Sequence, residues 1–169
     1  MTIKWFDRVF DFNLAYKDSD SICQRLTAAP DKIIRAVAGV DNDLLEEKKE
    51  GKWSVKEHVG HLSVLEPLWR ERLLDIQQGR PQLTPADLQN TATDDAGFNN
   101  YTVEELTAGF AAERNRTIAL LSQIDAKSVI DKSFHPRLKK EMGITDHLYF
   151  IAEHDDHHIA YIQEFLNRG

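Results

Sequence analysis

Apolar residues recur at helical spacing along most of the chain. The clearest stripe advances by three or four residues at each step and consists of Val55, Val59, Leu62, Leu65, Trp69, Leu73 and Ile76. Ser54 and Glu57 have the spacing of a capping box, so this helix should begin at Ser54 and end near Gly79. Pro67 lies inside the stripe and removes one backbone donor, which predicts a kink.

Three more helices are indicated by the same reasoning. Thr102 and Glu105 form a second capping box, and the apolar spacing that follows predicts a helix to about Leu121. A third stripe predicts a helix over residues 145–166. An earlier helix over residues 19–40 should be broken at Pro30, where the second half could begin with proline in its first turn.

The connections between these helices are polar and carry most of the turn-forming residues. They cover residues 46–53, 80–101 and 127–143, and no convincing alternating strand pattern occurs in the chain. We therefore expect an all-α fold, a four-helix bundle with long crossover connections. Residues 1–18 should form an N-terminal amphipathic arm, and residues 19–169 a single domain.

Composition narrows the classes of function. The chain has 169 residues and a formal net charge of −7 without a Lys/Arg cluster, which argues against a nucleic-acid partner. No apolar run approaches the ~18 residues of a membrane span, so we expect no membrane partner. Cys23 is the single cysteine, which excludes an intrachain disulfide and favours a reducing, cytoplasmic location.

Histidines carry the chemical signal, because six of the seven fall on two predicted helices. His154 and His158 are four residues apart, about 40° around the axis and ~6 Å along it, so both rings can reach one ion. His61, on the helix that begins at Ser54, could supply a third nitrogen. Three histidines with an open fourth position are typical of a catalytic metal site.

Spacing alone leaves other interpretations open. A single histidine on an apolar stripe is more often a core residue that is hydrogen-bonded to a neighbour. His157 could replace His158 as a ligand, although the inward position of His158 favours the latter. The His154-Asp155 pair would also fit a phosphohydrolase of the HD type, which needs a separate histidine and a distant aspartate.

Two segments resemble a known family. Residues 51–62, Gly-Lys-Trp-Ser-Val-Lys-Glu-His-Val-Gly-His-Leu, are similar to the "W-S-x-x-E-x-x-x-H-L" segment of the DinB/YfiT-like metalloproteins. Residues 152–158 resemble the "H-x-x-H-H" element of that family's last helix, in the same order and at the same separation. The resemblance implies a four-helix bundle with one divalent ion held by His61, His154 and His158, and a homodimer.

The resemblance also implies classes of activity. Members of this family include transferases and isomerases that use low-molecular-weight thiols, and others resemble hydrolases. We expect a metal-dependent enzyme that activates a small thiol toward an electrophile. The alternatives are a metal-dependent hydrolase and a stress-related binding protein without catalysis.

Imidazole ligands suit zinc or nickel, and also iron and copper; zinc and nickel are the expected ions. His135 and Arg137 are candidate contacts for a small-molecule substrate, the arginine for a carboxylate or phosphate. The alternative interpretation is that they cap their own loop, as loop side chains often do by bonding to the backbone.

Overall fold

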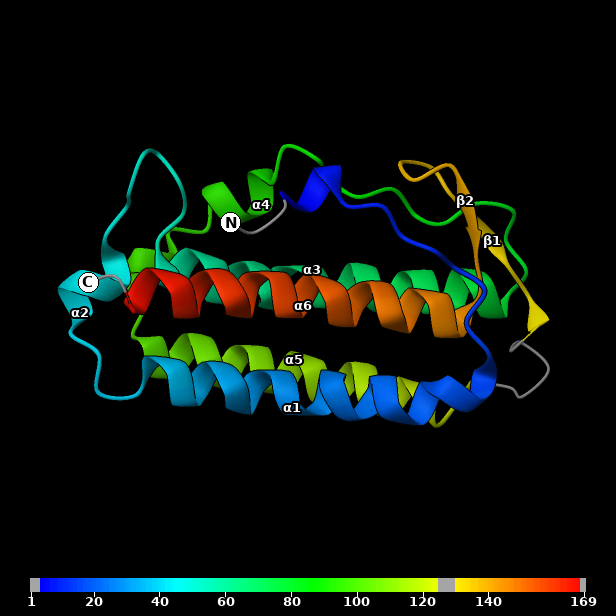
Figure 1. The fold of residues 1–169 in the computed structure, drawn as a ribbon, viewed down its shortest axis with the longest axis horizontal. Helices are drawn as coiled ribbons and strands as arrows, with labels where there is room; N and C mark the ends of the chain where they lie inside the picture. Colours follow the sequence, from blue (N-terminus) through cyan, green and yellow to red (C-terminus); the bar gives the residue numbers. More distant parts are fainter. Residues whose placement is uncertain (1–3, 125–129, 168–169) are drawn as a thin grey trace.

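The predicted four-helix bundle is confirmed in a computed structural model that describes residues 4–124 and 130–167. Its long helices are α1 (Ser19–Val37), α3 (Val55–Gln77), α5 (Val103–Leu121) and α6 (Ile144–Leu166). Figure 1 shows α3 and α6 in one layer and α1 and α5 in the other. Each helix packs against one neighbour in its own layer and one in the opposite layer.

Local capping fixes where two of these helices begin. The Ser54 side chain accepts from the Glu57 N–H and Glu57 accepts from the Ser54 N–H, as the capping box predicts. Thr102 and Glu105 form the same reciprocal pair at the start of α5. The sequence-based starts of both helices are therefore correct.

The predicted break at Pro30 is wrong, because α1 continues through the proline to Val37. Proline has no N–H for the carbonyl four residues earlier, which here belongs to Leu26. That carbonyl instead accepts from Nη1 of Arg114 on α5, at 3.1 Å. A tertiary hydrogen bond thus replaces the missing helical one.

Arg114 joins all four long helices. Besides the Leu26 carbonyl on α1, its guanidinium donates to Glu66 on α3 and to Asp155 on α6, with Nε–Oε1 2.9 Å and Nη1–Oδ2 2.6 Å. All three charged side chains are buried. Because Asp155 adjoins His154, this network sets the position of α6 where its histidines face α3.

Residues 78–102 form the long crossover of the bundle, which connects α3 to α5. The colours in Figure 1 show that α3 and α5 run in the same direction, so the chain must return along the length of the molecule. On the way it forms α4 (Thr91–Asp94) and the 3-10 helix η3 (Phe98–Asn100). Another short helix, α2 (Asn42–Glu46), precedes α3 and was not indicated by the apolar spacing.

A small antiparallel hairpin, also not expected from the sequence, lies between α5 and α6. It pairs β1 (Ser133–His135) with β2 (Lys140–Met142). Strands of three residues are too short for an alternating pattern to be recognised. The crossover is tied to this hairpin, because Leu83 N–H donates to the Phe134 carbonyl at 3.0 Å. Residues 127–129 of the predicted third connection lie outside the described residues.

The N-terminal arm covers the α3–α6 layer (Figure 1). It contains the 3-10 helices η1 (Trp5–Asp7) and η2 (Tyr16–Asp18); residues 1–3 lie outside the described part of the chain. Phe10 and Phe12 are buried in the core against Phe150 of α6. No helix among the described residues is long and apolar enough to span a membrane.

Candidate metal centre

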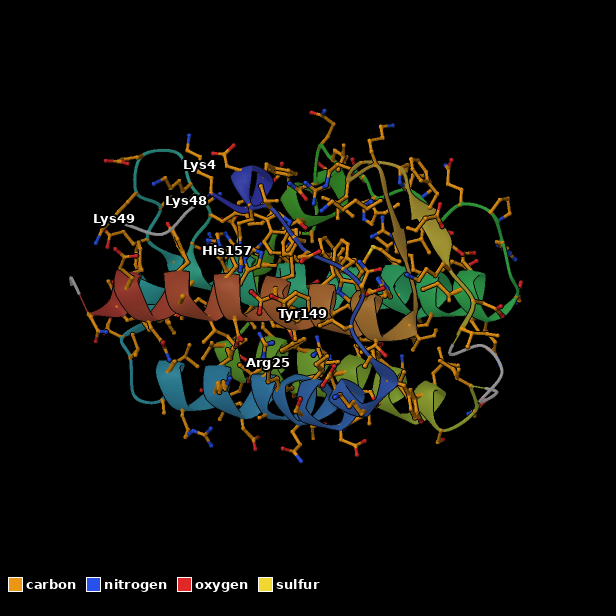
Figure 2. The ribbon with its side chains drawn as sticks, turned by 45° about the vertical axis from the view of Figure 1, so that its right-hand side comes forward. Lys4, Arg25, Lys48, Lys49, Tyr149 and His157 are labelled. Carbon is orange, nitrogen blue, oxygen red and sulfur yellow. The ribbon has the colours of Figure 1, made fainter. Side chains whose placement is uncertain are left out.

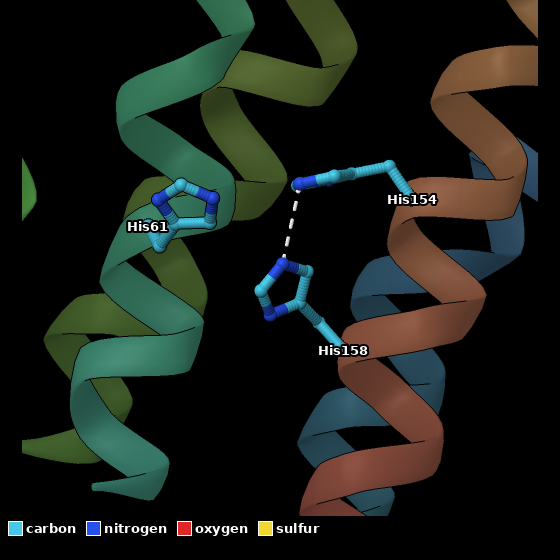
Figure 3. A group of neighbouring side chains, drawn as sticks. All are labelled: His61, His154 and His158. Carbon is cyan, nitrogen blue, oxygen red and sulfur yellow. Dashed lines mark hydrogen bonds between the residues drawn. The ribbon is translucent and has the colours of Figure 1, made fainter. Parts of the chain in front are cut away.

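The structure brings together the three histidines that the sequence analysis selected. His61 comes from α3, and His154 and His158 come from successive turns of α6. One ring nitrogen of each lies within 4.8 Å of the other two, and all three side chains are buried. Figure 3 shows the rings converging on one point between the two helices.

Neighbouring side chains orient two of the three rings. Nδ1 of His61 lies 2.9 Å from Oγ1 of Thr93 on α4, and Nδ1 of His158 lies 2.7 Å from Nδ1 of His58. A ring nitrogen that donates to such a partner leaves the other nitrogen free to bind a metal. With Nδ1 as the donor in both contacts, Nε2 is the available ligand atom on His61 and on His158. Nδ1 of His154 is buried without a partner among the described residues.

The spacing of the free nitrogens fits a divalent cation. Nε2 of His154 and Nε2 of His158 are 3.2 Å apart. Two ligands at a metal–nitrogen distance of about 2.0–2.1 Å in tetrahedral geometry would be about 3.4 Å apart. The donor set is all-imidazole, which suits zinc, nickel, copper and iron alike.

Burial keeps the three rings in the form that binds metal. It lowers the pKa of His61 to about 4, partly opposed by the negative charge of Asp94. Burial, and then the neighbouring histidines, lower the pKa values of His154 and His158 well below the ordinary value. All three imidazoles are therefore neutral at pH 7, as metal ligation requires.

All three tryptophans of the chain line this cluster. The Trp53 ring lies 4.6 Å from that of His61, and Trp5 and Trp69 lie 5.0 and 5.6 Å from His154, between ring centroids. Trp53 is itself fixed by a hydrogen bond from Nε1 to Asp94, at 2.8 Å. Trp5, Trp53 and Trp69 thus form an aromatic wall beside the cluster, which reduces its access to water.

His157 does not join the cluster. Its ring is half-buried, 5.7 Å from Trp5 and 5.4 Å from His158 between centroids. Of the two adjacent histidines, His158 is thus the one whose nitrogen meets His61 and His154.

Sequence analysis did not identify His58 and Thr93 as partners of the cluster. His58 precedes His61 by one turn of the same helix, so its spacing carried a weak signal. Thr93 lies in the crossover, 32 residues from the histidine that it contacts. No local pattern predicts that contact.

The histidine cluster forms part of the wall of a large cavity of about 1280 Å³. His135 and Arg137, the predicted substrate contacts, line the same cavity. Lysines gather around it as well: Lys4 and Lys49 belong to its lining, and Figure 2 shows both on the same side of α6 as His157. The cavity is lined by six basic and three acidic side chains, in a chain whose net charge is −7.

Comparisons with known proteins give the family from a family model and the fold from a solved structure. The DinB superfamily model matches residues 25–162. Among solved structures, YfiT from Bacillus subtilis superimposes with a TM-score of 0.80 at 22% identity, over 95% of this chain and 93% of that one. YfiT is described as a probable metal-dependent hydrolase with an unusual four-helix bundle topology. No functionally curated protein matches the chain.

Proposed function

The chain belongs to the DinB superfamily, and from this premise we propose that it is a metal-dependent enzyme acting on a small thiol. One divalent cation, zinc or nickel, is held by His61, His154 and His158. The enzyme activates a low-molecular-weight thiol for transfer to an electrophile. The observation that carries this proposal is the convergence of three neutral ring nitrogens within 4.8 Å on the wall of the cavity.

The neutral donor set decides which fourth ligand is favoured. Three imidazoles leave a divalent ion its full charge, and the described residues add no carboxylate to the cluster. A bound cation lowers the pKa of a thiol and so raises the fraction present as the nucleophilic thiolate. The aromatic wall strengthens this attraction by keeping the surroundings poorly solvated.

The thiol has to come from the substrate. Cys23, the single cysteine of the chain, lies on α1 and does not line the cavity. Burial, and then the charge of Asp20, raise the pKa of its thiol, which makes it a poor nucleophile at neutral pH. The chain's own contribution is to hold the cation and to enclose the electrophile.

The test combines metal analysis with an assay. Purified protein, loaded with zinc or nickel, is offered several small thiols together with chlorodinitrobenzene as electrophile. Thiol-dependent turnover should appear in the wild type and in Cys23→Ala, and should vanish in His61→Ala. Protein that retains no metal after gentle purification, and catalyses nothing when reloaded, would contradict the proposal and favour a non-catalytic binding protein.

A hydrolase is the second candidate, favoured by the description of YfiT as a probable metal-dependent hydrolase. The same cation would then activate water instead of a thiol. Nitrophenyl esters and amides distinguish the two reactions. Hydrolysis that depends on His61, without acceleration by any thiol, would replace the transferase proposal with this one.

A further inference from the structure

Two buried arginines of this chain have opposite surroundings. Arg72 and Arg114 are both 1% exposed. Arg114 is neutralised by the carboxylates of Glu66 and Asp155. Arg72 forms no ion pair with any described residue: Nε donates to the Thr84 carbonyl at 2.8 Å and Nη1 donates to Nε2 of His135 at 3.2 Å.

The acidic side chain that could neutralise Arg72 is already engaged. Asp75 pairs with Arg80 at 2.9 Å and accepts from the Thr84 N–H and hydroxyl at 2.7 and 2.8 Å. His135 cannot neutralise Arg72 either, because an imidazole ring is neutral or positively charged. Burial, and then the charges of Arg72 and Arg137, lower its pKa to about 3, so the ring is neutral. Arg72 therefore carries a buried charge whose hydrogen-bond partners are neutral, and the nearby charge of Asp75 only partly offsets the burial and the Arg137 charge that lower its pKa.

A second cation increases the imbalance. Arg137 is half-buried, its guanidinium 5.2 Å from the Phe6 ring centroid, and it makes no ion pair with a described residue. Its charge contributes, after burial, to the lowered pKa of Arg72, so the two guanidinium groups repel one another. Buried charges are normally paired, because an unpaired one costs several kcal/mol. Both arginines line the cavity that contains the histidine cluster.

We propose that Arg72 and Arg137 form an oxyanion-binding subsite that receives a carboxylate or phosphate group of the substrate. A planar guanidinium pair suits such a group, because each can donate two parallel hydrogen bonds. In this arrangement His135 is a positioning residue: it accepts from Arg72 and holds the guanidinium toward the cavity.

The position of the subsite also restricts the shape of the substrate. His61, Leu65, Trp69 and Arg72 follow each other at steps of four, four and three residues, so they share one face of α3. Arg72 follows His61 by eleven positions on α3, which places their Cα atoms about 16 Å apart along the helix. This inference rests on the proposed function, which places the reacting end of the substrate at the histidine cluster. The substrate is then an elongated molecule with its acidic group at the opposite end.

The experiment measures binding of inorganic phosphate and of succinate by titration calorimetry, with metal-loaded and with chelator-treated protein. Both forms should bind at least one probe, and the stronger probe identifies a phosphate or a carboxylate as the group recognised. Arg137→Gln should weaken that binding at least about tenfold, because it removes one charge-assisted hydrogen bond. Arg116→Gln is the matched control, because Arg116 is 68% exposed and pairs with Glu113.

The outcomes distinguish failure of the subsite from failure of the metal-dependent function. Metal content of Arg137→Gln should remain that of the wild type. Metal binding without any affinity for phosphate or succinate, or equal affinity in Arg137→Gln, would overturn the subsite and leave the metal proposal intact. Anion binding in a protein that takes up no zinc or nickel when these ions are added would support the subsite and contradict the metal-dependent function. Arg72→Gln serves as a second variant, provided that its circular dichroism matches the wild type.

Discussion

His58 and His158 face each other through their Nδ1 atoms, 2.7 Å apart, across the α3–α6 interface. One of the two nitrogens must donate, and donation by His158 leaves its Nε2 free for a metal. Replacing His58 by alanine removes this orientation and should weaken metal affinity by about 10–100-fold without abolishing binding. Competition with a chromogenic chelator measures the change. An unaltered dissociation constant would show that the contact does not orient His158.

The three proposed ligands should act as a set. The wild type should bind one divalent ion per chain. Each single replacement of His61, His154 or His158 by alanine should reduce this occupancy sharply, because two imidazoles bind a metal far more weakly than three. His157→Ala is the control and should leave occupancy close to one. Elemental analysis of the purified variants gives the answer. Loss of metal in His157→Ala, with full occupancy in His158→Ala, would place the ligand one residue earlier.

Removing the ion should leave the bundle folded. A chain of this length buries enough surface to fold without metal, unlike small zinc domains. Chelation should preserve the helical circular dichroism. It should lower the melting temperature by roughly 5–10 °C relative to protein kept at an ion concentration about 100 times the dissociation constant. Unfolding at room temperature on chelation would instead assign the ion a structural role.

Acid should destabilise the metal-free protein. Burial lowers the pKa of His58 to about 3 and of His61 to about 4, whereas the unfolded chain titrates near 6.5. Between these values the unfolded state binds more protons, so stability is fully present above pH ~6.5 and falls as the pH drops toward ~4. Each such histidine contributes a loss of about 1.4 kcal/mol per pH unit. Urea denaturation at several pH values measures the slope; constant stability between pH 7 and 5 would contradict the burial of neutral rings.

Gly60 provides a test of the crossover packing. A Cβ atom at this position would lie 2.4 Å from the Phe98 ring, whereas one at Gly109 would meet only the Ser63 hydroxyl, at 3.9 Å. Gly60→Ala should destabilise the fold by about 1–3 kcal/mol through overpacking, more than the roughly 1 kcal/mol of helix propensity that it gains. Gly109→Ala keeps the propensity gain alone and should be neutral or stabilising. Equal effects in urea denaturation would show that Phe98 moves aside freely.

Sequence reasoning succeeded where the determining contacts are local. Capping boxes lie within four residues, and the His154–His158 pair lies on one helix face, so both could be predicted. The passage of α1 through Pro30 could not, because it depends on Arg114, which is 88 residues from Leu26. For the same reason the contact of Thr93 with His61 and the unpaired charge of Arg72 became visible only in three dimensions.

The aromatic wall gives this molecule a built-in optical reporter. Since Trp5, Trp53 and Trp69 are the only tryptophans and all contact His61 or His154, the whole indole emission originates beside one cluster. A paramagnetic ion such as copper or nickel bound there would quench all three fluorophores together, whereas zinc would leave them bright. Binding of a quenching ion, and its exchange for zinc, can therefore be followed in real time with unlabelled protein.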